Sequence, residues 1–219
     1  AAQRAIRYLV QSQHSEGGWR YGPRQPGDTS VVAWVFLAIR SGQLARLAVD
    51  RAALAKADKF LNTVAAGPDE AKLSRYRYQP DDKAATPALT AAGLLTREYI
   101  GWEKDNSDLI AGCTYLMQNL PPEYAKSVGS MYYYYYATQV LHHMEGESWD
   151  KWNHRMREHL IYTQEQSGEQ AGSWPSTGTD HGSRVGGRLY TSSLALLTLE
   201  VYYRHLPLYR RAVKPPAEK

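Results

Sequence analysis

Cysteine is almost absent from this chain of 219 residues, in which Cys113 is the single one. A lone cysteine excludes an intrachain disulfide framework and a cysteine-rich zinc site. It does not identify the compartment in which the protein works.

Long apolar runs and clustered charges are also missing. No apolar run approaches the 18 residues of a membrane-spanning helix, so we expect no transmembrane segment. The net charge is +4, but the lysines and arginines are scattered along the chain. A scattered excess of this size does not predict nucleic-acid binding, which needs a basic patch or stripe.

Phenylalanine is scarce, with 2 residues against 17 tyrosines and 6 tryptophans. Tyr and Trp bury a large apolar body but carry one polar group that needs a partner. We therefore expect these residues to line a cavity of mixed polarity or a hydrated interface.

Helical patterns pair into four units, at about 1–45, 50–100, 106–145 and 148–209, within one domain over 1–209. In each unit an amphipathic stretch precedes a more uniformly apolar one. The second helices are expected to begin at Asp28 or Thr29, at Thr86, near Ser130 and at Thr191. We expect the tail over 210–219 to be disordered. Because the chain opens at Ala1 inside an apparent helix, we expect flanking domains of a larger protein.

The first two units align as an internal repeat. Trp19-Arg20-Tyr21 matches Tyr76-Arg77-Tyr78, and Thr29 and Thr86 each follow ten residues after the leading aromatic residue. Arg40 and Arg97 also correspond. Only an enclosed helix needs apolar residues on every side, so the second helix of each unit is predicted to be inner and the first outer. The sequence predicts an all-α fold, an αα-toroid or open arc of four hairpins with eight main helices.

The stretch Tyr8–Trp19 reads YLVQSQHSEGGW. It matches the aromatic-Leu-x-x-x-Gln-x-x-x-Gly-x-Trp pattern called the QW motif, with Gln13, Gly17 and Trp19 in the named positions. Gln164 and Trp174 form a looser copy. The chain therefore resembles the squalene-cyclase and prenyltransferase repeat superfamily. With TPALTAAGLL and MYYYYYATQVLHH it is similar, more narrowly, to uncharacterised squalene-cyclase-like domains of planctomycete-type bacteria.

This resemblance implies an αα-toroid in which the QW residues tie neighbouring hairpins together. It also raises an isoprenoid cyclase or prenyltransferase-like enzyme as an alternative function. Proton-initiated cyclases use an Asp-x-Asp-Asp-Thr-Ala cluster, of which this chain keeps only Asp28 and Thr29. Asp28 and Asp82 are the candidate acids and His142 a candidate acid–base group, although helix capping and loop solvation are the simpler roles of the two aspartates. The prenyltransferase zinc ligands lack their family spacing here, so we predict no metal and no cofactor.

The run Tyr132–Tyr136 is the most unusual feature of the sequence. On a helix, Tyr132 and Tyr136 share a face with Gln139 and His143. These rings are suited to stabilising a cation or stacking on a sugar, and packing inside a tight inner helix explains them equally well. The candidate ligand-binding residues are Trp34, Tyr132, Tyr135, Tyr136, Gln139, His143, Arg188 and Tyr190.

We therefore expect a non-catalytic squalene-cyclase-like repeat domain that binds an apolar or aromatic small molecule, or a protein partner, along its aromatic inner helices. The isoprenoid enzyme is the first alternative. A carbohydrate-active (α/α) toroid with a carboxylate pair is the second. The sequence does not determine the substrate or the localisation.

Overall fold

The computed structural model describes residues 1–124 and 127–204, and this part of the chain is helical without any strand. The eight longer helices are α1 (Ala2–Gln11), α2 (Thr29–Leu44), α3 (Arg51–Thr63), α4 (Pro87–Ile100), α5 (Ser107–Met117), α6 (Met131–Met144), α7 (Gly146–Thr163) and α8 (His181–Leu199). A 3-10 turn η1 (Asp69–Ala71) and a short helix α9 (Val201–Arg204) complete the fold. The all-α prediction is confirmed. The predicted tail over 210–219 lies outside the described residues.

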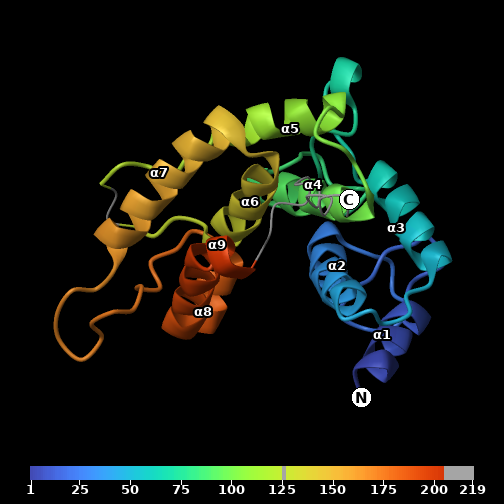
Figure 1. Cartoon of the computed structure of the whole chain (residues 1–219), viewed down its shortest axis with the longest axis horizontal. Coiled ribbons are helices and arrows are strands. Elements are labelled where there is room, and N and C mark those ends of the chain that lie inside the picture. Colours follow the sequence, from blue (N-terminus) through green and yellow to red (C-terminus); the bar gives the residue numbers. More distant parts are fainter. Residues whose placement is uncertain (125–126, 205–219) are drawn as a thin grey trace, which may run out of the picture.

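The helices form two concentric rows (Figure 1). In the inner row α2 packs against α4, α4 against α6, and α6 against α8. In the outer row α1 covers α2, α3 covers α4, α5 lies over α4 and α6, and α7 covers α6. Within the described residues α2 and α8 do not pack extensively on each other, so the array is an open arc. The fourth hairpin is also splayed, since α7 packs on α6 rather than on α8.

All four inner helices begin in the same way. The side chains of their N-cap residues each accept a hydrogen bond from the backbone N–H three residues later. These caps are Asp28, Thr86, Ser130 and Asp180. A local signal of this kind is readable in the sequence, and it places the starts of α2, α4 and α6 where they were predicted.

The predicted start of the last helix was wrong. Asp180, not Thr191, caps α8, and Thr191 lies inside the helix with its hydroxyl bonded to the carbonyl of Gly187. The first turns of α8 are polar and glycine-rich and show no apolar periodicity. A kink at Gly187, with φ 60° and ψ −150°, then turns the helix into its apolar segment. The apolar helical periodicity of α8 therefore begins only after Gly187, and the sequence predicted a helix start near that point.

The repeat alignment is displaced by one residue. Asp28 caps α2 nine residues after Trp19, whereas Thr86 caps α4 ten residues after Tyr76. Thr29, aligned by sequence with Thr86, instead donates its hydroxyl hydrogen to the carbonyl of Arg77, 2.5 Å away, and so ties the first unit to the second. One residue on a helix is a rotation of about 100°. Residues that correspond in sequence therefore face different directions.

The glutamines and tryptophans at the two ends of the array make matching hydrogen bonds. The indole N–H of Trp19 donates to the carbonyl of Leu9, at 2.7 Å, and that of Trp174 to Leu160, at 2.9 Å. The amides of Gln13 and Gln164 donate to the carbonyls of Gly17 and Gly172 respectively. Only Gln13 also reaches the next hairpin, donating to the carbonyl of Ala53 in α3 at 2.9 Å.

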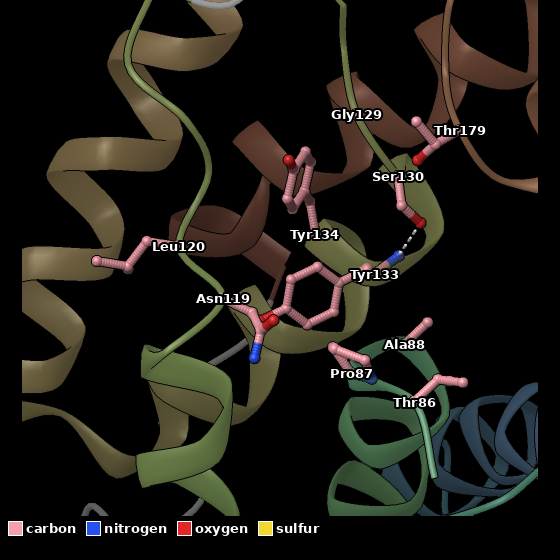
Figure 2. Close-up of a pocket in the computed structure, with 10 residues that line it drawn as sticks. All are labelled: Thr86, Pro87, Ala88, Asn119, Leu120, Gly129, Ser130, Tyr133, Tyr134 and Thr179. Carbon is pink, nitrogen blue, oxygen red and sulfur yellow. Dashed lines mark hydrogen bonds between the residues drawn. The ribbon is translucent and has the colours of Figure 1, made fainter. Parts of the chain in front are cut away.

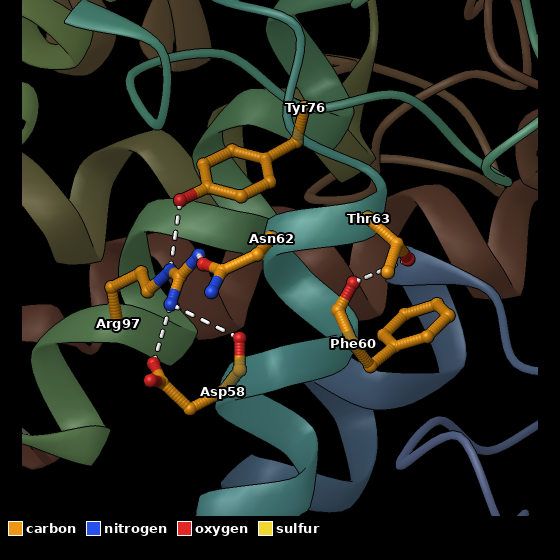
Figure 3. A network of polar contacts seen from close by, with 6 residues as sticks. All are labelled: Asp58, Phe60, Asn62, Thr63, Tyr76 and Arg97. Carbon is orange, nitrogen blue, oxygen red and sulfur yellow. Dashed lines mark hydrogen bonds and ion pairs between the residues drawn. The ribbon is translucent and has the colours of Figure 1, made fainter.

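Arg97 connects inner helix α4 to outer helix α3 (Figure 3). The residue is 1% exposed. Its guanidinium donates to the hydroxyl of Tyr76 at 2.9 Å and to the side-chain oxygen of Asn62 at 2.6 Å, and it pairs with the carboxylate of Asp58. Burial raises the pKa of the Tyr76 hydroxyl to about 12, although Arg97 acts in the opposite direction. Four polar groups thus satisfy one another between the two helices.

Helix α6 lies at the centre of the hydrophobic core. Its residues from Met131 to His143 are buried, except for the half-exposed Tyr132. The helix packs against α4, α5, α7 and α8. No helix in the described part of the chain has both the length and the apolar character to cross a bilayer.

Candidate functional site

A cavity of about 660 Å³ lies where the first turns of the four inner helices meet. We call it the central cavity. Five aromatic residues line it, namely Tyr21, Trp34, Tyr78, Tyr132 and Tyr190. Its polar lining consists of Ser30, Thr86, Ser130, Asp180 and His181. Three of the predicted ligand-binding residues, Trp34, Tyr132 and Tyr190, are therefore brought together.

A group of stacked rings lies at the inner end of this cavity. Trp34 stacks on Tyr135, with ring centroids 5.8 Å apart and planes 17° apart, and meets Tyr136 edge-on at 5.7 Å. Tyr132 packs against Tyr136 at 4.8 Å. Trp34 is nevertheless 41% exposed, since it lines open space. This ring group joins α2 to α6, two inner helices that α4 otherwise separates in the inner row.

A second cavity, of about 380 Å³, lies on the other side of Trp34, toward the C-terminal ends of α2 and α4. Trp34, Tyr135, Tyr99 and Arg40 are among its lining residues. The Arg40 guanidinium carbon is 6.0 Å from the centroid of the Tyr99 ring. Because Trp34 lines both cavities, its indole separates one from the other.

A third cavity, of about 410 Å³, adjoins the central cavity at the first turns of α4 and α6 (Figure 2). Thr86, Ala88 and Ser130 line both. Here Tyr133 donates its hydroxyl hydrogen to the carbonyl of Leu116 at 3.0 Å, and its ring centroid lies 5.5 Å from that of Tyr134.

The five consecutive tyrosines therefore face different surroundings. Tyr132 faces the central cavity, Tyr135 the second cavity, and Tyr133 and Tyr134 the third. Tyr136 is fully buried among the rings of Trp34, Tyr132 and Tyr135. Burial raises the pKa of the Tyr132 hydroxyl well above its usual value, and the nearby Asp28 carboxylate adds to this effect.

Gln139 and His143 line none of these three cavities. The Gln139 amide donates to the carbonyl of Tyr135 at 3.2 Å, and the Tyr99 hydroxyl donates to its side-chain oxygen at 3.4 Å. The Nδ1 atom of His143 lies 3.0 Å from a carboxylate oxygen of Glu98. At Gln139 and His143 the face that the sequence assigned to a ligand is thus occupied by contacts with α4, while Tyr132 on the same face lines the central cavity.

Arg188 and His142 also lie away from the central cavity. Arg188 donates to the hydroxyl of Ser173 at 2.9 Å, on the loop that precedes α8. His142 packs against the ring of Trp149, with centroids 4.9 Å apart, and faces α7 and α9. Adjacent residues on a helix point apart, and here neither histidine of the pair enters a described cavity.

The two candidate acids have different surroundings. The Oδ1 atom of Asp28 accepts from the N–H of Val31 at 2.9 Å and from the hydroxyl of Ser30 at 2.6 Å. Its Oδ2 atom is buried and without a hydrogen-bond partner, and the residue is 0% exposed. Asp82 lies in a loop, where its Oδ2 accepts from the N–H of Gln79 at 2.7 Å, and it does not line the central cavity. Of the two, only Asp28 lies beside the central cavity, because its hydrogen-bond partner Ser30 lines that cavity.

Sequence reasoning missed Glu98 as a partner of His143. Both side chains are buried between α4 and α6. Burial raises the pKa of the Glu98 carboxyl well above its usual value, while the positive charge of Lys104 acts against this rise. The available signal was a carboxylate inside an otherwise apolar helix, since such residues are seldom buried unless paired.

Glu98 should make the stability of the protein depend on pH. Its folded-state pKa is raised, so its stabilising contribution is complete below the pKa of an unfolded glutamate, about 4.3, and is lost as pH rises through the folded value. We expect E98Q to remove this decline, whose slope is at most about 1.4 kcal/mol per pH unit for one proton. Urea unfolding of both proteins between pH 4.5 and 8.5 measures it. Equal slopes would contradict the prediction.

The described residues contain no group of three His, Cys, Asp or Glu side chains arranged to hold a metal ion. Cys113 is buried, and burial raises the pKa of its thiol. A thiol in these surroundings is a packing group rather than a nucleophile.

Comparison of the chain with protein-family models, with curated proteins and with solved structures found no match in any of the three. Its function must therefore be argued from the cavity itself.

Proposed function

We propose that this protein is a non-catalytic repeat domain of squalene-cyclase-like type that binds a small molecule in the central cavity. One observation carries the proposal: the first turns of four separate inner helices meet at a single space of about 660 Å³, which five aromatic side chains from these helices and their preceding loops also line. Ligand sites in proteins have volumes of about 300–1,000 Å³ and are mostly apolar, with a few polar groups.

The lining supports this choice. Tyr and Trp present large apolar faces, while Ser30, Thr86 and Ser130 supply hydroxyl groups at the helix starts. Trp34 is 41% exposed and Tyr21 is 81% exposed. Aromatic residues left this open within a cavity are available to a ligand, because no protein group covers them fully.

The isoprenoid-cyclase alternative rests on Asp28, a buried carboxylate beside an aromatic cavity. Two features favour binding over this chemistry. Oδ1 of Asp28 is already engaged by the start of α2, as in an ordinary helix cap. The exposure of Tyr21 leaves the cavity open to water, which would quench a reactive carbocation.

The proposal is tested with N-phenyl-1-naphthylamine, an uncharged probe that fluoresces in apolar sites. We expect one probe to bind per chain, and Trp34→Leu to weaken binding by about tenfold through loss of one stacking face. Trp149→Leu is the matched control, since Trp149 is half-buried and lines none of the three cavities. Absence of binding, or equal losses in the two variants, would refute the proposal.

A further inference from the structure

The central cavity has no lysine or arginine in its lining, although the protein is basic overall, with a net charge of +4. The one carboxylate side chain there is that of Asp180. A ligand that enters therefore meets one carboxylate, no lysine or arginine and several aromatic rings.

A second carboxylate, that of Asp28, lies directly behind the lining. Its charge acts on Tyr78 and Tyr132, two of the five aromatic residues of the cavity. At Tyr78 it is opposed by Arg20, whose guanidinium carbon lies 5.8 Å from the ring centroid. Its Oδ2 atom is fully buried without a partner. A buried carboxylate oxygen in that state destabilises the folded protein unless a donor or a positive charge comes close to it.

Asp180 lies at the opposite end of the arc, at the start of α8. Its Oδ1 atom accepts from the N–H of Ser183 at 2.8 Å. The carboxylate also lies beside the Tyr190 hydroxyl, whose pKa is raised mainly by burial and further by this charge. The two aspartates thus approach the cavity from the two terminal inner helices.

The helix dipoles and the two aspartate charges nearly balance. Each helix N-terminus carries roughly +0.5 elementary charge, so the four together supply about +2. The two aspartate caps offset that amount. The negative faces of the aromatic rings remain, and they attract cations within about 6 Å of their centroids.

We propose that the ligand of the central cavity is an organic cation, an alkylated ammonium group on a small apolar body, held between aromatic faces and compensated by Asp28 and Asp180. This inference rests on the proposed binding function and adds the charge of the ligand. An alkylated ammonium suits the site because it can shed its water at low cost, whereas a metal ion would demand several oxygen ligands.

Three probes of matched shape test the charge. Choline is the cation, 3,3-dimethylbutan-1-ol is its uncharged analogue with carbon in place of nitrogen, and 3,3-dimethylbutanoate is an anion of similar size. Their affinities are measured by ligand-observed NMR titration of the full chain. We expect choline to bind about tenfold more tightly than the alcohol, and the anion most weakly.

Asp28→Asn identifies the carboxylate responsible. Asparagine is also a good N-cap, so α2 should keep its start while the charge is lost. We expect the preference for choline over the alcohol to fall below about threefold in D28N, with affinity for the alcohol unchanged. Asp180→Asn is the second variant and should lower the preference in the same direction. Asp50→Asn is the matched control, since Asp50 caps the outer helix α3 and lines none of the three cavities.

The outcomes separate the inference from the function on which it rests. If the naphthylamine probe binds in a Trp34-dependent manner but the alcohol or the anion binds as well as choline, the ligand is not a cation and only this inference fails. An unchanged preference in both D28N and D180N also overturns it. If neither the probe nor choline binds, both proposals fail.

Discussion

Replacement of Arg97 by methionine is expected to lower the free energy of unfolding by about 3 kcal/mol. The substitution keeps much of the apolar volume but removes every donor that serves Tyr76, Asn62 and Asp58. The Asp58 side chain is 39% exposed and regains water, which places the cost at the lower end of the range for a broken buried pair. Urea unfolding, with the slope checked against wild type, measures it.

Arg40→Met is the control for that experiment. Arg40 aligns with Arg97 in sequence, but it lines the second cavity and lies over the Tyr99 ring. We expect a loss below about 1 kcal/mol, the usual value of a partly exposed cation–π contact. Equal losses in the two variants would show that the network between α3 and α4 is not what makes Arg97 important.

Substitution of Gly17 by alanine is expected to cost about 3 kcal/mol, for two reasons that add. Gly17 has φ +99°, a region that side chains disfavour. A Cβ atom at this position would also overlap the backbone carbonyl of Lys56 in α3. The loop that follows α1 packs directly on the outer helix of the next hairpin, so α3 would have to move.

Gly172→Ala separates these two reasons. Like Gly17, Gly172 lies two residues before a tryptophan, and its carbonyl accepts a hydrogen bond from a glutamine amide. Its φ is +83°. No atom lies within 4 Å of a Cβ placed there. We expect only the backbone cost, about 1 kcal/mol, in the same unfolding assay. A loss in G172A equal to that in G17A would mean that contact between hairpins contributes nothing.

This pair of glycines also shows what the repeat signature does in the fold. At Gln13 and Gly17 the motif clamps one hairpin to the next, through Ala53 and Lys56. At Gln164 the amide bond stays within its own loop. The signature therefore has a structural role, and the proposed binding function depends instead on the side chains of the inner helices.

The sequence alone determined the helices and most of their starts. Caps such as Asp28, Thr86 and Ser130 act over three residues, and the indole bonds of Trp19 and Trp174 act within one hairpin. Interactions of such short range involve residues that are close in the sequence, so the sequence predicts them. The sequence did not predict the start of α8, because the first turns of this helix lack apolar periodicity before the kink at Gly187.

Tertiary structure decided which side chains form the site. Helix α6 is apolar on every side, so its pattern carries no contrast from which to read the direction of Tyr132 or His143. A displacement of one residue at the caps turned Arg40 toward a cavity and Arg97 into the core, although the two align in sequence. The pairing of Glu98 with His143 and the place of Asp28 behind the aromatic lining depend on how separate helices pack, and no local spacing encodes that.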